Sequence, residues 1–99
     1  MNTEKVTNLL FEAIKEFNSE NSYNLNQSLD TVLFGENSPL DSLGLVNFIV
    51  AVEERIEDDL DISLTLADEK AMSERNSPFR TVQAFRDYIL KLIVEANNE

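Results

Sequence analysis

The chain has 99 residues and a mass of 11.3 kDa, which predicts one domain covering residues 1–99. Nineteen acidic against eight basic residues give a formal charge of −11, which disfavours nucleic-acid binding and favours partners with basic surfaces. The sequence contains neither cysteine nor histidine, which excludes disulfides, thiolate metal sites and Ser-His-Asp or Cys-His catalytic sites. Its apolar runs are short and its N-terminus carries several glutamates, so we expect no membrane insertion and no signal peptide.

The first predicted element is a helix from about Glu4 to Phe17, with Thr3 as its N-cap. Its apolar residues recur at helical spacing: Val6, Leu9, Leu10, Ala13, Ile14 and Phe17. A long loop rich in asparagine and serine follows and runs to about Leu40. We expect the apolar residues of this loop to pack on the core, and one turn of helix is compatible with residues 29–33.

The second predicted helix begins at Asp41 or Ser42 and runs to about Glu57, with Asp41 as its N-cap. One side carries apolar residues for the core: Leu45, Phe48, Ile49, Val52 and Ile56. A small helical domain cannot bury a helix on all sides, so we expect part of the opposite side to face solvent and bind a partner. That side carries Leu43, Val46, Val50, Glu53, Glu54 and Glu57. The alternative interpretation is that the long loop covers these apolar residues and that the acids form a solvated face.

The segment from Leu60 to Leu66 alternates apolar and polar residues, which is typical of a strand. No second alternating run could pair with it, so we interpret it as an extended connection with its apolar side chains turned inward. Thr65 and Asp68 have capping-box spacing, which predicts a short third helix through about Ser73. Thr81 is the predicted N-cap of a last helix with one apolar stripe: Val82, Phe85, Ile89, Leu92, Ile93 and Ala96. The predicted fold class is therefore all-α, a four-helix bundle with a long first loop and a short third helix.

No metal site and no catalytic site is predicted. A calcium-binding EF-hand loop starting at Asp59 would need glycine and glutamate where the sequence has Leu64 and Lys70. An enzyme without histidine or cysteine would need a Ser-Lys pair or paired carboxylates, and none of the four lysines lies near Ser42 in the sequence. We therefore expect a protein that is not an enzyme.

The segment Asp41-Ser42-Leu43, followed by GLVNFIVAVEE, resembles the attachment site and recognition helix of the acyl carrier protein family. The resemblance covers nearly the whole chain, including the long loop, the short third helix and Thr81-Val82 at the start of the fourth. It implies that Ser42 carries a covalent 4′-phosphopantetheine, that Asp41 supports its transfer, and that Leu43 lies beside it. It also implies contacts with basic patches of partner enzymes through Val46, Asn47, Val50, Glu53, Glu54 and Glu57.

By this resemblance, a phosphopantetheinyl transferase of the holo-carrier-protein synthase type loads Ser42 from coenzyme A. The thiol of the arm then holds acyl intermediates as thioesters for enzymes of a fatty-acid, polyketide or specialised lipid pathway, and the carrier is a cytoplasmic monomer. Physical chemistry supports the attachment site independently, because a helix N-terminus favours an anion such as a phosphodiester.

Two positions depart from the family pattern: Gly44 stands where many relatives have Asp, and Asn47 where many have Glu. Both departures remove charge near the arm and indicate a specialised carrier. Two alternatives remain open. One is an aminoacyl or D-alanyl carrier, and the other is an unmodified acidic helical adaptor that binds a basic partner.

Overall fold

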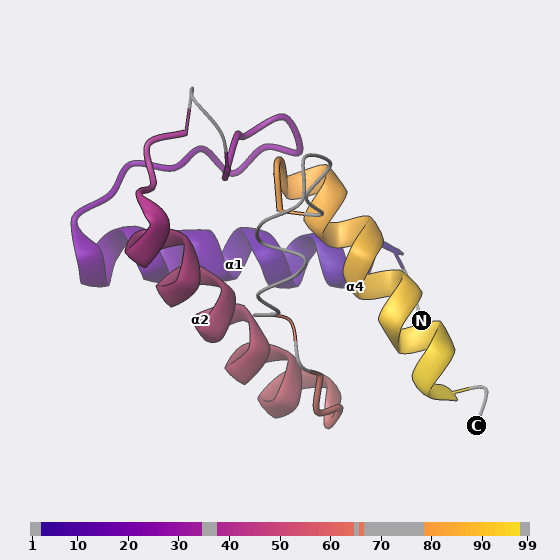
Figure 1. Cartoon of the computed structure of the whole chain (residues 1–99). Helices are drawn as coiled ribbons and strands as arrows, with labels where there is room; N and C mark the ends of the chain where they lie inside the picture. The colour runs from indigo at the N-terminus through magenta and orange to yellow at the C-terminus, as the bar shows by residue number, and fades with distance from the viewer. Residues whose placement is uncertain (1–2, 35–37, 65, 67–78, 98–99) are drawn as a thin grey trace.

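A computed structural model of the chain describes residues 3–34, 38–64, 66 and 79–97. This part of the chain is all-α and contains three helices: α1 (Thr3–Asn21), α2 (Ser42–Leu60) and α4 (Val82–Asn97). Helix α1 packs against both α2 and α4, which cross it and lead away from the first loop (Figure 1). The predicted short third helix, residues 65–73, lies outside the described residues except for Leu66.

Helix α1 is longer than predicted at both ends. It includes Thr3, which we expected to precede it as the N-cap, and it continues past Phe17 to Asn21. A side-chain amide supports this added turn, because Nδ2 of Asn18 donates to the carbonyl oxygen of Leu25 and its Oδ1 accepts the N–H of Leu25, both at 2.9 Å. Asparagine side chains bind the main chain in loops and at helix ends alike. Composition alone therefore placed the helix end one turn too early.

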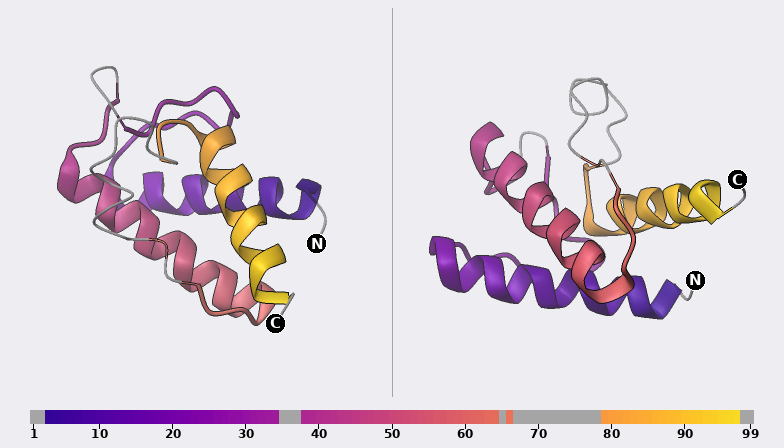
Figure 2. Two further views of the ribbon diagram at one scale, coloured as in Figure 1. Left: turned by 45° about the vertical axis from the view of Figure 1, so that its right-hand side comes forward. Right: turned by 90° about the horizontal axis from the view of Figure 1, so that it is seen from below.

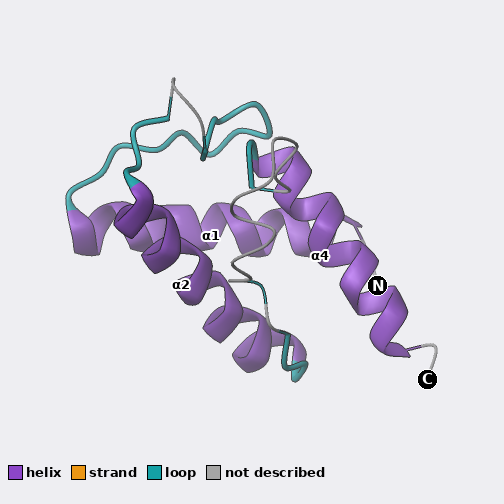
Figure 3. Ribbon diagram, in the orientation of Figure 1, coloured by secondary structure: helices purple, strands orange, loops and turns teal. Residues whose placement is uncertain are grey.

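Helix α2 is also one turn longer than predicted, since it ends at Leu60 rather than near Glu57. Asp61 closes it with a left-handed backbone (φ 55°), and its N–H donates to the carbonyl oxygen of Glu57 at 3.0 Å. The residues that follow form no strand within the described segment (Figure 3), which confirms the prediction of a connection. Its apolar side chains pack against the core as expected: Leu60, Ile62, Leu64 and Leu66.

The first loop is held by main-chain pairing with the segment that precedes α4. The helical turn considered for residues 29–33 is absent, because Val32 forms an isolated antiparallel bridge with Thr81. The N–H of Leu33 donates to the carbonyl oxygen of Arg80 at 2.8 Å. The loop therefore leaves α1, reaches the start of α4 and then returns to α2 (Figure 2).

The predicted cap and apolar stripe of α4 are confirmed over its described side chains. The hydroxyl oxygen of Thr81 accepts the N–H of Ala84 at 3.1 Å, as an N-cap does. Leu92 is only partly buried, and the side chain of Ala96 lies outside the described set. The other members of the stripe are buried: Val82, Phe85, Ile89 and Ile93.

Aromatic rings connect the three helices at the centre of the core. The ring of Phe48 on α2 contacts Phe17 on α1 (centroids 5.3 Å apart, 72° between planes) and Phe85 on α4 (6.1 Å, 67°). Phe79 extends this series, with its centroid 5.2 Å from that of Phe85. Edge-to-face pairs of this kind stabilise by about 0.5–1.5 kcal/mol beyond the burial of area. The whole predicted core face of α2 is buried: Leu45, Phe48, Ile49, Val52 and Ile56.

We predict that Phe48→Ala lowers the free energy of unfolding by about 3–5 kcal/mol, because it removes a fully buried ring that contacts both neighbouring helices. Urea denaturation followed by circular dichroism measures the change. Val94→Ala is the matched truncation on an exposed site and should change the value by less than about 0.5 kcal/mol. Similar effects of the two substitutions would contradict this description of the core.

Candidate functional site

The candidate site is the first turn of α2, which begins at Ser42 and is capped by Asp41, as predicted. Oδ1 of Asp41 accepts the N–H of Gly44 at 2.6 Å, and its carbonyl oxygen accepts the N–H of Leu45 at 2.9 Å. The N–H groups of Ser42 and Leu43 belong to the same first turn, where the helix itself provides no acceptors. The positive end of the helix dipole lies at the same point. The start of α2 therefore has the donors and the polarity to bind an anionic group.

A serine at the end of the first loop orients the chain as it enters α2. The hydroxyl of Ser38 donates to the carbonyl oxygen of Leu33 at 2.7 Å and accepts the N–H of Leu40 at 3.0 Å. Leu40 is buried in the core directly before the cap. These contacts fix the position of Asp41 from the N-terminal side.

A side chain at the position of Gly44 would require its neighbours to shift. A Cβ atom there would lie 2.8 Å from the hydroxyl oxygen of Tyr23 and 3.0 Å from Oδ1 of Asp41. The ring of Tyr23 is itself held, because it stacks on Phe17 with centroids 5.2 Å apart and an angle of 11° between the planes. An aspartate at position 44, common in the family that the sequence resembles, would collide with this tyrosine. The sequence pattern predicted only that apolar residues of the first loop pack on the core, and gave no sign that Tyr23 lies beside the candidate site.

The outer face of α2 exposes apolar side chains, as we predicted for part of this set. Leu43 is 69% exposed and Val50 is 40% exposed. Val46 is partly buried. Asn47, which lies between Leu43 and Val50 in the sequence, is exposed. Large apolar side chains on one exposed helix face are typical of a protein-docking surface.

The three glutamates predicted for partner binding differ in their surroundings. Glu54 and Glu57 are exposed. Glu53 is partly buried, and its Oε2 accepts the main-chain N–H of Leu66 at 2.6 Å. Its carboxylate therefore holds the connection that follows α2, a role that the sequence pattern did not indicate.

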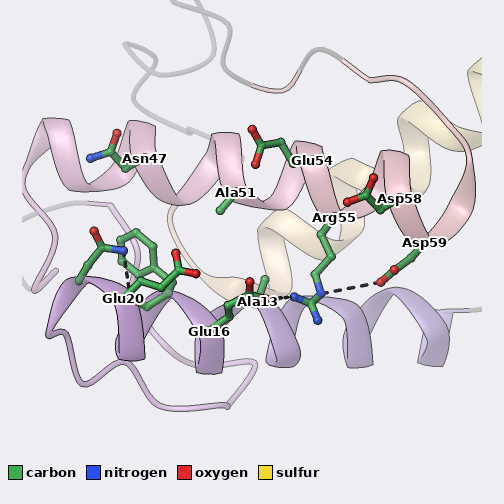
Figure 4. A pocket seen from close by; sticks show the side chains of 11 residues that line it. Ala13, Glu16, Glu20, Asn47, Ala51, Glu54, Arg55, Asp58 and Asp59 are labelled. Atoms are coloured by element: carbon green, nitrogen blue, oxygen red, sulfur yellow. Dashed lines mark hydrogen bonds and ion pairs between the residues drawn. The ribbon is translucent and has the colours of Figure 1, made fainter.

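An arginine joins α2 to α1 at the edge of an acidic groove. Arg55 forms an ion pair with Glu16 on α1, and its Nε lies 3.8 Å from a carboxylate oxygen of Asp59 (Figure 4). The groove beside it has a volume of about 550 Å³ and is lined mainly by polar side chains, which do not suit an apolar chain. Its lining residues are Ala13, Glu16, Phe17, Glu20, Asn21, Asn47, Ala51, Glu54, Arg55, Asp58 and Asp59. The partner of Arg55 lies 39 residues away in the sequence, so no local pattern could have identified this pair.

Comparisons with protein-family models, with curated proteins and with solved structures found no match for this chain. Within the described residues, no helix is long and apolar enough to cross a bilayer. The same residues bring together no group of three or more acids that could hold a metal ion. The candidate site therefore rests on its own geometry and on the sequence pattern.

The cap of α2 makes a first prediction for the site. Asp41→Ala should lower the free energy of unfolding by about 1 kcal/mol, because the N–H of Gly44 loses its acceptor. Asp41→Asn keeps an acceptor oxygen at that position and should leave stability nearly unchanged. Urea denaturation compares the three proteins, and equal losses for both variants would show that the cap hydrogen bond is not what stabilises this turn.

The closeness of Tyr23 to Gly44 gives a second prediction for the site. Gly44→Ala should destabilise the protein by about 1 kcal/mol, because overpacking outweighs the better helix propensity of alanine. In a Tyr23→Phe background the nearest obstructing atom is gone, and the loss should shrink by about 0.5 kcal/mol or more. A double-mutant cycle of urea denaturation measures this coupling. An identical loss in both backgrounds would mean that the hydroxyl does not restrict position 44.

Proposed function

We propose that this chain is a carrier of the acyl carrier protein type and that Ser42 bears a 4′-phosphopantetheine group. The proposal includes the four-helix fold of that family, of which the described residues contain three helices. One observation carries it: Ser42 is the first residue of α2, directly after the Asp41 cap and directly before the exposed Leu43.

The residues at the start of α2 suit the proposed group. A phosphodiester on Ser42 would lie beside first-turn N–H groups that the helix does not use, and a helix N-terminus favours an anion by about 0.3–1 kcal/mol. Leu43 and Asn47 are exposed on the first two turns, so a transferase can approach this side of the helix. Once attached, the group supplies a thiol on a flexible arm, which a chain without cysteine lacks.

The chain itself supplies recognition and no reactive centre in this proposal. A phosphopantetheinyl transferase, and enzymes that transfer or modify acyl groups, would contact Leu43, Val46, Asn47 and Val50 and the exposed glutamates Glu54 and Glu57. Because exposed charges are screened by salt, these encounters should slow as ionic strength rises.

Two other functions use the same surface. An aminoacyl or D-alanyl carrier would carry the same arm with a different cargo, and the described residues do not distinguish these cargoes. An unmodified acidic adaptor would bind a basic partner through the exposed apolar residues and acids of α2 but would carry no arm. Covalent modification therefore separates the adaptor from both carriers.

Intact-mass spectrometry after incubation with coenzyme A, Mg²⁺ and a broad-specificity transferase tests the proposal. The wild-type chain should gain the mass of one phosphopantetheine, and Ser42→Ala should gain none while keeping its helical circular dichroism. Ser63→Ala removes another hydroxyl, from an exposed residue, and should be modified like the wild type. Modification of Ser42→Ala would rule this site out, and an unmodified wild type would favour the adaptor.

A further inference from the structure

The outer face of α2, defined by the exposed Leu43 and Val50, has one border along the connection that follows α2 and another along the groove between α1 and α2. On the side of the connection after α2, Glu53 is partly buried and accepts the N–H of Leu66 at 2.6 Å. Glu53 keeps its negative charge and a second oxygen, but this bond fixes the orientation of its carboxylate. Because Glu53 is partly buried, its carboxylate is less accessible to a partner than that of an exposed acid.

The other border runs directly into the groove between α1 and α2. Asn47 and Glu54 line the groove and are exposed. Residues three and four apart on a helix are surface neighbours, so Val50 adjoins both of them and Leu43 adjoins Asn47. The exposed apolar residues and the groove thus form one continuous surface.

Among the described residues that line it, this groove has more acids than bases. Five acids and one arginine line it, and Arg55 is engaged by Glu16 and Asp59. The remaining acids, Glu20, Glu54 and Asp58, are exposed and form no ion pair within the part of the chain that the structure describes. Like charges gathered on two packed helices repel one another, and cations on a partner would relieve this repulsion.

We infer that a basic protein surface docks across α1 and α2 together, over Leu43, Val50, Glu20 and Glu54. The inference rests on the proposed carrier function, because it names the side from which the transferase reaches Ser42. The occupant is a protein and not a metal ion or a polyamine, since only a protein surface also covers two exposed apolar side chains.

Steady-state kinetics of phosphopantetheine transfer by the broad-specificity transferase test the inference. Glu20→Lys combined with Glu54→Lys should lower kcat/KM about tenfold at low salt, mainly through KM, because docking contacts are lost before the chemical step. The loss should shrink as salt rises. The matched control is Asp30→Lys combined with Glu95→Lys, which makes the same change in net charge on exposed sites away from the groove. It should change kcat/KM less than about twofold.

Each result has a defined meaning. Equal losses of kcat/KM for the groove pair and the control pair would overturn the inference, because they would show that only the net charge of the protein matters. A larger loss for Glu53→Gln than for the groove pair, in a folded protein, would place docking on the other border and also overturn it. If the wild type accepts no phosphopantetheine, the carrier function itself fails and the inference fails with it.

Discussion

The start of α2 is held from two sides, by the contacts of Ser38 and Leu40 before the cap and by Tyr23 beside Gly44. Helices α1 and α2 are joined by residues 22–41, which contain no helix in their described part, and a connection of that length leaves the relative position of its ends open unless it is held. Here Tyr23 stacks on Phe17 of α1, and its hydroxyl lies against the first turn of α2 at the one residue without a side chain. Through Tyr23, Phe17 of α1 is connected to the turn of α2 that begins with Ser42.

The second determinant is the division of α2 into two faces. Burial of five apolar side chains on one face stabilises the helix, because each fully buried side chain of this size contributes about 1.5–3 kcal/mol. The outer face is therefore free to carry residues that contribute little to folding. Leu43 and Val50 lie there with their apolar side chains exposed to water, which is unfavourable for the isolated chain. Such exposure is expected where a surface serves binding.

Periodicity and capping chemistry predicted most local features, although not the start of α1 or the absence of a helical turn at residues 29–33, and they predicted no long-range pair. The buried face of α2, the caps Asp41 and Thr81, and the exposure of Leu43 all follow from the residues of one helix or turn. The pairs Arg55–Glu16, Glu53–Leu66 and Val32–Thr81 follow from which segments meet in space, and no local pattern encodes that choice. The helix ends at Asn21 and Leu60 were misplaced for a related reason, since tertiary contacts extend a helix beyond its propensity.

The distribution of charge accounts for how such a surface can bind and release. Exposed acids around two apolar side chains speed encounters with a basic surface, but each exposed ion pair contributes only about 0.2–1 kcal/mol. A docked complex held mainly by Leu43 and Val50 would therefore be small and short-lived, as the proposed carrier function requires. Glu20, Glu54 and Asp58 are exposed and form no ion pair among the described residues, so the α1 side of α2 supplies charge that can direct such encounters.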